Sequence, residues 1–553
     1  MSSSNVDFSD LVQSYFQAWF RFHPETAVDI GVRGFESSLT PFDDDDLGAL
    51  TALNEKLIDS LDEINTSALT PAQSIDRDVL YGNAVIELSD LVEQDWRYRD
   101  PVRYLPIHAI YQLTLHNLEH NRQHLKNRLL GIPHHLRNAQ SNLHGRPESI
   151  PPQWLDAAHR QAVQGATYLR SLRKHPVFMQ HGLNSELEQA AHAVDEYARF
   201  MEVELQPHAA GDFACGRARF ERLLLHRHAL PVSAPELHAL GERLFEQTLT
   251  ELKKVTIELQ GHDDVEQLTK KIQANHPSAN QLIEQYRQNM LASREFVARE
   301  DLVTLPDTES LKVVETPVFL RHEIPFAAYM EPPFNDPGQQ GYYYVTPVED
   351  EASLGEHNWT SLRHTCVHEA WPGHHLQFVT ANLGKSSSSL PRLTNPSATM
   401  YEGWALYCEQ LMQEQGFLDQ PESRFVLLKD RLWRALRIML DVELHTTGLT
   451  LEEAASRMQQ WLGFTHEQAM ADLGWYTRAP TVPMGYATGW ALIAKTRERL
   501  AQMEPSFNLK AFHDRLLTEG SIALSHVIRQ QFGLPLWEAV QREIFIQSGT
   551  TNT

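Results

Sequence analysis

A chain of 553 residues with 42% hydrophobic and 22% charged residues has the size and composition of a large globular protein. This excludes a disordered or fibrous protein, and a core of this size does not need disulfides to stay folded. The 72 acidic residues outnumber the 48 basic ones, and the formal net charge of −24 argues against nucleic acid or an anionic membrane surface as a partner.

The cellular compartment is predicted from the start of the chain and from its cysteines. The first residues show no basic segment followed by an apolar one, and no run of about eighteen apolar residues occurs anywhere. Three cysteines are too few, and odd in number, for a disulfide framework. We therefore expect a cytoplasmic protein without a membrane span.

Helical periodicity dominates the chain. Apolar residues recur at helical spacing in segments 11–20 and 431–445, and Ser233 has the position of a capping residue before another apolar run. These patterns predict a mainly α-helical fold of roughly twenty helices. We expect an N-terminal helical region, 1–230, and a second region, 231–553, which together form one compact unit.

Strand character is concentrated in two segments. β-Branched and aromatic residues cluster at 311–321 (LKVVETPVFLR) and 341–346 (GYYYVT), between turn signals. We expect a small β-sheet here, beside the segment that carries the chemistry. The tyrosines of GYYYV are either core residues or, with Tyr343 as the expected contact, part of an exposed edge to which a peptide adds a strand.

The segment 366–377, CVHEAWPGHHLQ, contains an unusual set of polar residues. Four of them could bind or assist a metal: His368, Glu369, His374 and His375. In the common HExxH zinc motif the histidines lie four residues apart, so that both rings reach one ion. Here the position four residues after His368 is Pro372. Proline has no side-chain atom that binds a metal, so a regular helix cannot form this site.

The Pro-Gly pair offers a way to bring two histidines together. His375 returns to the helix face of His368 but lies about 10 Å further along the axis, too far to share an ion. Pro372 and Gly373 are residues at which a helix breaks and restarts, and this would bring His374 beside His368. The alternative is a helix end with surface histidines.

A third ligand is expected from a later helix. Glu402 opens the helix-forming stretch EGWALYCEQL, 34 residues after His368, which leaves room for a loop and an antiparallel return. Catalytic zinc usually has three protein ligands and one water, so we expect Glu402 as the third ligand. Its alternative role is an exposed carboxylate in a first helical turn. Glu409 lies seven residues further and is expected to orient a ligand histidine.

The motifs HEAWPGHHLQ (HExxPGHH), EGWALYCEQL and GYYYV resemble those of the bacterial family of unknown function numbered 885, and the resemblance covers most of the chain. At the zinc site this family is similar to the mostly helical gluzincins, such as thimet oligopeptidase and Taq-type carboxypeptidases. The resemblance implies a zinc-dependent peptidase fold with His368, His374 and Glu402 as ligands and Glu369 as general base. Two extra residues between the histidines leave the second ligand open between His374 and His375.

Two further residues could complete a hydrolytic site. The run TVPMGYATGW places Tyr486 between glycines and resembles the segment of oligopeptidase relatives in which a phenol stabilises the oxyanion. The alternative is a tyrosine packed at a helix start. Arg478, nearby, either pairs with a substrate carboxylate or makes an ordinary ion pair.

Together these residues predict a metallopeptidase that uses one Zn²⁺ to hydrolyse short peptides. The ion would polarise the carbonyl, and Glu369 would take a proton from water and deliver it to the leaving amine. Carboxypeptidase, dipeptidase and endo-oligopeptidase activities fit the motifs equally. Two other functions stay open: a zinc hydrolase of a non-peptide amide or ester, and a non-catalytic helical binding protein.

Overall fold

A computed structural model describes residues 7–545 apart from 115–117, 175–177, 180–181, 318–319, 322–323, 325 and 349–350. The described chain is mostly helical with one small sheet, so the predicted fold class is confirmed. It divides into two compact units, Met1–Phe213 and Ala214–Thr553. The expected regions 1–230 and 231–553 stay a prediction, and Ser233 caps the start of a helix within the second unit.

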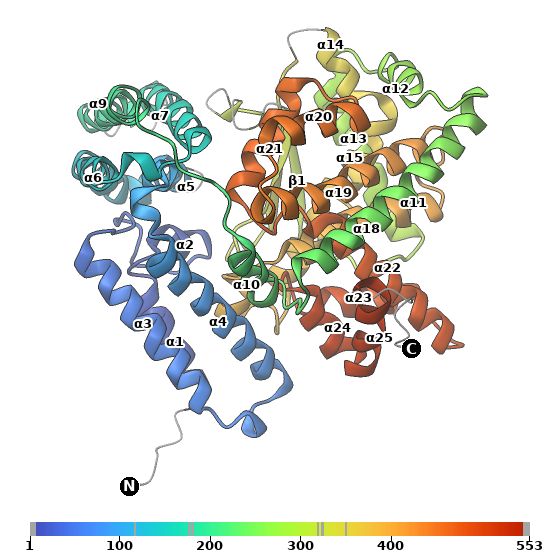
Figure 1. Ribbon diagram of the computed structural model, residues 1–553, viewed down its shortest axis with the longest axis horizontal. Coiled ribbons are helices and arrows are strands. Elements are labelled where there is room, and N and C mark those ends of the chain that lie inside the picture. Colours follow the sequence, from blue (N-terminus) through green and yellow to red (C-terminus); the bar gives the residue numbers. More distant parts are fainter. Residues whose placement is uncertain are drawn as a thin grey trace. The chain divides into compact units, whose positions relative to one another are not determined.

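The first unit is an array of helices (Figure 1). They are α1 (Phe8–Trp19), α2 (Pro24–Asp29), α3 (Asp44–Glu63), α4 (Pro71–Ser89), α5 (Ile107–Thr114), α6 (Leu118–His144), α7 (Pro152–Leu172) and α9 (Asn184–Phe200). Helix α1 buries Tyr15, Phe16 and Trp19, the apolar stripe visible in the sequence. Helix α3 pairs with α4, and α9 packs against α6 and α7. All candidate site residues lie outside this unit.

The second unit contains a larger set of helices. They are α10 (Arg217–Arg227), α11 (Ala234–Gln260), α12 (Val265–Gln273), α13 (Leu282–Arg299), α14 (Glu351–Leu354), α15 (Trp359–Glu369), α16 (His374–Leu383), α17 (Leu390–Leu393), α18 (Ala398–Glu414), α19 (Ser423–Thr446), α20 (Leu451–Leu462), α21 (His466–Arg478), α22 (Gly485–Met503), α23 (Leu509–Leu517), α24 (Leu524–Phe532) and α25 (Leu534–Phe545). The two longest, α11 and α19, run along each other, and α18 packs along α22 (Figure 1). Helix α11 begins with the predicted capping box, in which Ser233 Oγ accepts from the Glu236 amide.

The second unit also contains a three-stranded sheet of β1 (Ser310–Glu315), β2 (Ala327–Met330) and β3 (Gln340–Val345). The central strand is β3, which is parallel to β1 and antiparallel to β2. The GYYYV strand is therefore paired on both sides and is not the exposed edge considered from the sequence, and Tyr343 is only 1% exposed. Strand β2 pairs with β3 alone among the described strands. Residues 318–319 of the first predicted strand lie outside the described residues.

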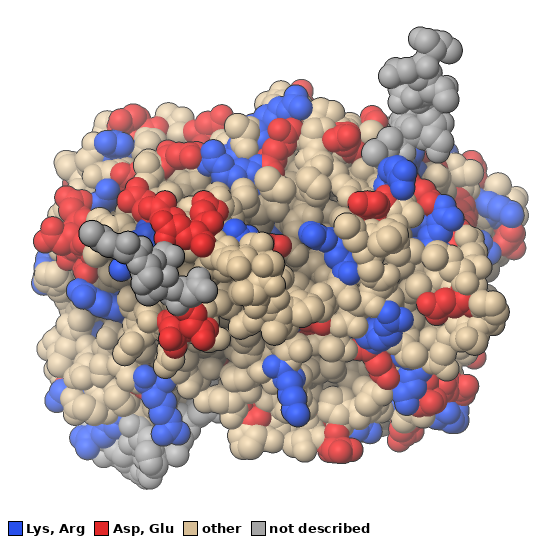
Figure 2. All heavy atoms as spheres, turned by 90° about the horizontal axis from the view of Figure 1, so that it is seen from below, with Lys and Arg blue, Asp and Glu red and all other residues tan. Residues whose placement is uncertain are grey.

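Charged side chains of both signs lie on the face shown in Figure 2. Figure 2 shows Lys and Arg side chains scattered among Asp and Glu side chains over one face of the molecule. Such interspersed charge is typical of a globular surface. None of the described helices combines the length and apolarity needed to cross a lipid bilayer. The expectation that neither nucleic acid nor a membrane is a partner stays a prediction.

Candidate metal centre

Helices α15 and α16 are separated by a break at residues 370–373. Helix α15 ends at Glu369, because Ala370 leaves the helical region with φ −111° and ψ −95°. The amide of Gly373 then donates to the carbonyl of Val367 at 3.1 Å, so the break stays attached to the last turn of α15. Helix α16 restarts at His374. This is the interruption that the Pro-Gly pair predicts.

Only glycine fits at position 373. A Cβ atom added there would lie 1.9 Å from the carbonyl oxygen of His368 and 2.4 Å from that of Val367. Both neighbours are backbone atoms of the helix that carries a predicted ligand, so neither can move without moving the site. The missing side chain allows α16 to start close enough to place His374 beside His368.

Replacing Gly373 with alanine is expected to destabilise the protein by at least about 2 kcal/mol, because the added methyl group must displace backbone. Urea unfolding followed by circular dichroism measures this change. Gly474→Ala is the matched control: it lies in α21 with no atom within 4 Å of an added Cβ, so it should be neutral or stabilising. A Gly373→Ala protein as stable as the wild type would contradict the proposed close approach.

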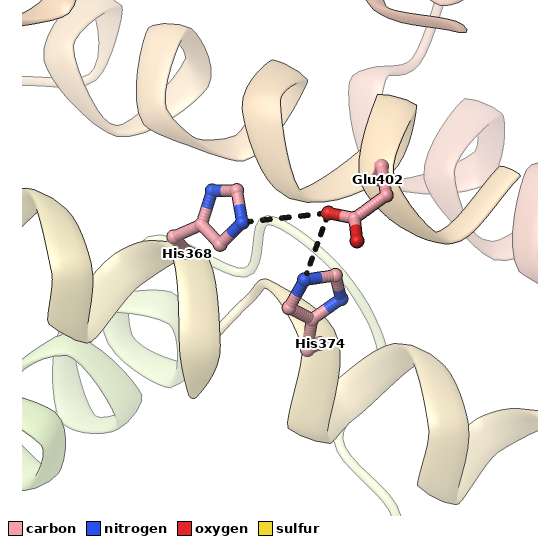
Figure 3. Close-up of side chains that lie close together, drawn as sticks. All are labelled: His368, His374 and Glu402. Carbon is pink, nitrogen blue, oxygen red and sulfur yellow. Dashed lines mark ion pairs between the residues drawn. The ribbon is translucent and has the colours of Figure 1, made fainter. Parts of the chain in front are cut away.

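The side chains of His368, His374 and Glu402 point toward one another from α15, α16 and α18 (Figure 3). Nε2 of His374 lies 3.3 Å from Oε2 of Glu402, and Nε2 of His368 lies 3.7 Å from the same oxygen. The two imidazole rings have their centroids 4.8 Å apart. The structure thus brings together the three residues that the sequence suggests as ligands.

The geometry of these three residues suits a divalent metal. In a tetrahedral zinc site with bonds of about 2.1 Å, neighbouring ligand atoms lie about 3.4 Å apart, close to the separations from Glu402 to the two histidines. Oε2 of Glu402 is buried and has no hydrogen-bond partner among the described residues, which is costly unless a cation meets it. Two imidazoles and a carboxylate form a common donor set for zinc.

Glu409, two turns further along α18, supports His368 from behind. Its Oε1 lies 2.7 Å from Nδ1 of His368, which leaves Nε2 directed at Glu402. Its Oε2 lies 3.6 Å from Nδ1 of His364, one turn earlier on α15. Burial opposes protonation of His368, but attraction to Glu402 and Glu409 outweighs it and raises its pKa to about 10. The same two carboxylates would stabilise a metal cation.

His375 is directed away from this cluster. The residue is fully buried, with Nε2 2.9 Å from Oε2 of Glu309 and Nδ1 3.1 Å from the hydroxyl of Tyr329. Both ring nitrogens therefore have partners inside the protein. His375 connects α16 to the sheet through Tyr329, and His374 is the histidine that faces Glu402.

Glu369 and the three clustered residues line one cavity of about 1,120 Å³. Glu369 is half-buried, and its carboxylate makes no hydrogen bond or ion pair with another described residue. All four residues of β2, Ala327–Met330, contribute to the cavity wall. The same cavity is thus bordered by the carboxylate of Glu369, by the candidate metal centre and by strand β2.

Tyr486 lies beside Glu402, because helices α18 and α22 approach each other closely. A Cβ atom on Gly403 of α18 would lie 2.5 Å from Cα of Gly489 in α22, so the contact depends on both glycines. Burial and the charge of Glu402 hold the pKa of Tyr486 well above its ordinary value. The hydroxyl group therefore stays protonated and remains a hydrogen-bond donor.

Asp441 of α19 supports the segment before Tyr486. Its carboxylate accepts hydrogen bonds from the amides of Thr481 and Met484, at 3.2 and 3.3 Å. Burial nevertheless raises its pKa to about 8, more than these bonds lower it. The fully buried His445 lies 3.9 Å away. The sequence marks this pair only by its spacing of four residues and does not reveal its role in holding the loop.

The two residues expected to bind substrate lie differently in the structure. Tyr343 borders the cavity but is nearly fully buried in β3, and Arg478, at the end of α21, is not among the residues that line it. The arginines in the cavity wall are Arg434 and Arg437 of α19, which the sequence-based reasoning missed. Their only signal is a spacing of three residues within RLWRALR.

The profile of the family described as "Bacterial protein of unknown function (DUF885)" matches residues 24–530, most of the chain. The chain belongs to this family. The resemblance stated from its motifs is thereby confirmed. No curated protein is detectably similar to this DUF885 protein.

Solved structures with TM-scores of 0.78 and 0.80 share the fold of this DUF885 protein, whereas a third is similar only at a TM-score of 0.41. A putative lipoprotein of unknown function from Shewanella oneidensis is 21% identical, with a TM-score of 0.78 over 95% of this chain and 99% of that one. A putative lipoprotein from Colwellia psychrerythraea is 18% identical, with a TM-score of 0.80 over 98% and 100%. The M32 carboxypeptidase from Deinococcus radiodurans R1 is 13% identical, with a TM-score of 0.41 over 97% and 99%.

The predicted cytoplasmic location is wrong. The two structures with TM-scores of 0.78 and 0.80 are both described as putative lipoproteins, which overturns an assignment to the cytoplasm. The prediction used the first residues of the chain and its three cysteines, none of which forms a disulfide. Unpaired cysteines fit a reducing compartment but do not require one, so composition could not establish the location.

Proposed function

We propose that this DUF885 protein is a zinc-dependent peptidase that hydrolyses short peptides. The observation that carries the proposal is the convergence of His368, His374 and Glu402 beside Glu369 on the wall of one cavity. His368, His374 and Glu402 would hold the ion. Bound there, zinc would polarise a carbonyl group and lower the pKa of a water molecule toward 7.

The protein's own side chains would carry the proton transfers and the orientation of the substrate. Glu369, whose carboxylate has no partner in the described chain, would accept a proton from the attacking water and deliver it to the leaving amine. The protonated hydroxyl of Tyr486, beside Glu402, would donate to the oxygen on which negative charge develops. Glu409 would keep the ring of His368 in place.

A peptide is the substrate class that the cavity wall favours. Strand β2 lies at the outer side of the sheet, and every one of its residues borders the cavity. An extended peptide that adds to such an edge satisfies its backbone hydrogen bonds there, which an isolated ester or small amide cannot do. This favours a peptidase over a hydrolase of non-peptide amides or esters.

Metal analysis and peptide turnover test the proposal together. The protein purified without added metal should contain about one zinc ion per chain, and it should cleave members of a mixed library of short peptides, detected by mass spectrometry. Zinc without cleavage of any peptide would favour a hydrolase of another amide or ester. Neither zinc in the purified protein nor zinc binding on titration would favour a non-catalytic binding protein.

A further inference from the structure

We infer that the cavity recognises the free carboxylate at the end of a peptide through Arg434 and Arg437 of α19. The inference rests on the proposed peptidase function and adds its substrate class, peptides with an unblocked C-terminus. Both arginines line the cavity that also contains Glu369 and the clustered histidines. Their hydrogen bonding and their distance from the candidate metal centre carry the argument.

Arg437 is buried but only partly paired. The residue is 5% exposed, its Nε donates to the hydroxyl of Tyr476 at 2.7 Å, and its Nη2 donates to Oδ1 of Asp472 at 3.1 Å. Its Nη1 is buried and has no hydrogen-bond partner among the described residues. The Cζ atom of Arg437 lies 4.2 Å from the centroid of the Trp433 ring and 4.6 Å from that of Tyr486. Because a guanidinium group has donors only and keeps its charge, an acceptor from outside the chain would complete its hydrogen bonding.

Arg434, one turn earlier on α19, has two nitrogens that also lack a hydrogen-bond acceptor in the described part of the chain. Its Nε and Nη1 are both buried, and neither has a hydrogen-bond partner in the described part of the chain. The carboxylate of Asp430 stays 3.7 Å from Nη1, which is too long for a hydrogen bond. Three buried donors on two neighbouring arginines thus lack acceptors. A planar carboxylate, with two acceptor oxygens, is the group that such donors recognise best.

The arginines are at the right place to hold the end of a substrate. Cζ of Arg437 lies 4.6 Å from the centroid of the Tyr486 ring, and Cζ of Arg434 lies 5.7 Å from it. Tyr486 also interacts with Glu402, so the arginines and the candidate metal centre border the same tyrosine on the wall of one cavity. An extended residue covers about 3.3–3.6 Å, so a carboxylate one or two residues beyond the scissile bond would reach them.

Charge favours a chain end over a chain that continues. The side chains of Arg437 and Asp472 are 6% and 16% exposed, so both belong to the buried part of the cavity wall. A terminal carboxylate can pair with the arginine donors directly, whereas the backbone of a continuing chain carries no charge to match them. An acidic side chain next to the scissile bond would offer the same chemistry, and the experiment separates these two sources.

Three peptides of one length test the inference: a free C-terminal acid, the same peptide as a C-terminal amide, and the amide with glutamate as its last residue. We expect kcat/KM for the free acid to exceed that for the plain amide by at least about 100-fold, because the amide leaves buried donors unpaired. Equal cleavage of acid and plain amide would overturn the inference and leave the proposed peptidase intact. Equal cleavage of the acid and the glutamate amide would show that the arginines recognise an acidic side chain and not the C-terminal carboxylate.

Variants on one helix connect this preference to the arginines. Arg434→Met is expected to lower kcat/KM for the free acid by about 100-fold and so to remove most of the preference for the acid over the amide. Arg424→Met is the matched control, because Arg424 lies on α19 but is 49% exposed and outside the cavity wall. Arg437→Lys, which keeps the charge but changes the donor geometry, serves if Arg434→Met fails to fold. A free-acid preference that survives in the folded variant would overturn the assignment.

Binding separates failure of this inference from failure of the proposed function. The acid and the amide are titrated by calorimetry into the Glu369→Gln protein as purified, so the result does not depend on cleavage. We expect the acid to bind at least about 10-fold more tightly than the amide. Equal binding, or binding of neither, would overturn the inference even if peptides are cleaved. If the variant prefers the acid but the wild-type protein cleaves no peptide, the result would support the anion site and count against the peptidase.

Discussion

Replacing Glu369 with glutamine is expected to lower kcat by about 10²- to 10⁴-fold and to leave the zinc content unchanged. Glutamine has nearly the same size but cannot accept a proton, and Glu369 is not part of the cluster formed by His368, His374 and Glu402. The measurement combines initial rates of peptide cleavage with elemental analysis of the same preparation.

The control for this prediction is Glu295→Gln, which removes an exposed carboxylate on α13, outside the cavity. Its rate should equal that of the wild type. A Glu369→Gln protein with bound metal and an unchanged kcat would exclude Glu369 as the general base. Loss of the metal would instead show that this carboxylate contributes to the metal site.

His374→Ala and His375→Ala form a pair with opposite expected effects. His374→Ala should weaken zinc binding by much more than the 10- to 100-fold typical of an outer partner, because it removes one of the three proposed ligands. His375→Ala should retain zinc but lose about 3 kcal/mol of stability, because the buried carboxylate of Glu309 loses a hydrogen-bond partner. Arg294, at 2.6 Å from Glu309, keeps that carboxylate partly paired.

Titration with chelator-buffered zinc measures the affinity of each variant, and urea unfolding measures its stability. The neighbouring histidines are matched in type and in burial, so each variant serves as the control for the other. Zinc affinity lost in His375→Ala but kept in His374→Ala would reverse the assignment of the second ligand. Unfolding experiments on the metal-free proteins keep the effect of the ion separate from that of packing.

Much of the candidate centre could be predicted because it is local in sequence. His368 and His374 lie on two sides of Pro372 and Gly373, whose backbone chemistry alone predicts a broken helix. The choice of His374 over His375 could not be made from the sequence. It depends on Glu309 and on Tyr329 of β2, which occupy both nitrogens of His375 only in the folded chain.

The remaining differences arise from tertiary structure. Strand β2 has the sequence Ala-Ala-Tyr-Met, which carries little strand propensity, so its place at the edge of the sheet was missed and GYYYV was considered for it. Arg434 and Arg437 look like ordinary polar residues of a long helix until the cavity is known. Helix periodicity, by contrast, predicted α1, α11 and α19 well, because each has one strongly apolar face.

The candidate metal centre and the two arginines of the cavity wall come from separate stretches of the chain. His368, His374 and Glu402 fall within 35 residues, whereas Arg434, Arg437 and Tyr486 belong to α19 and α22. Substitutions at Arg434 and Arg437 could therefore alter which substrate is selected without changing the three residues of the candidate metal centre. Members of the family could in this way differ in the substrates that they select while they keep the same candidate metal centre.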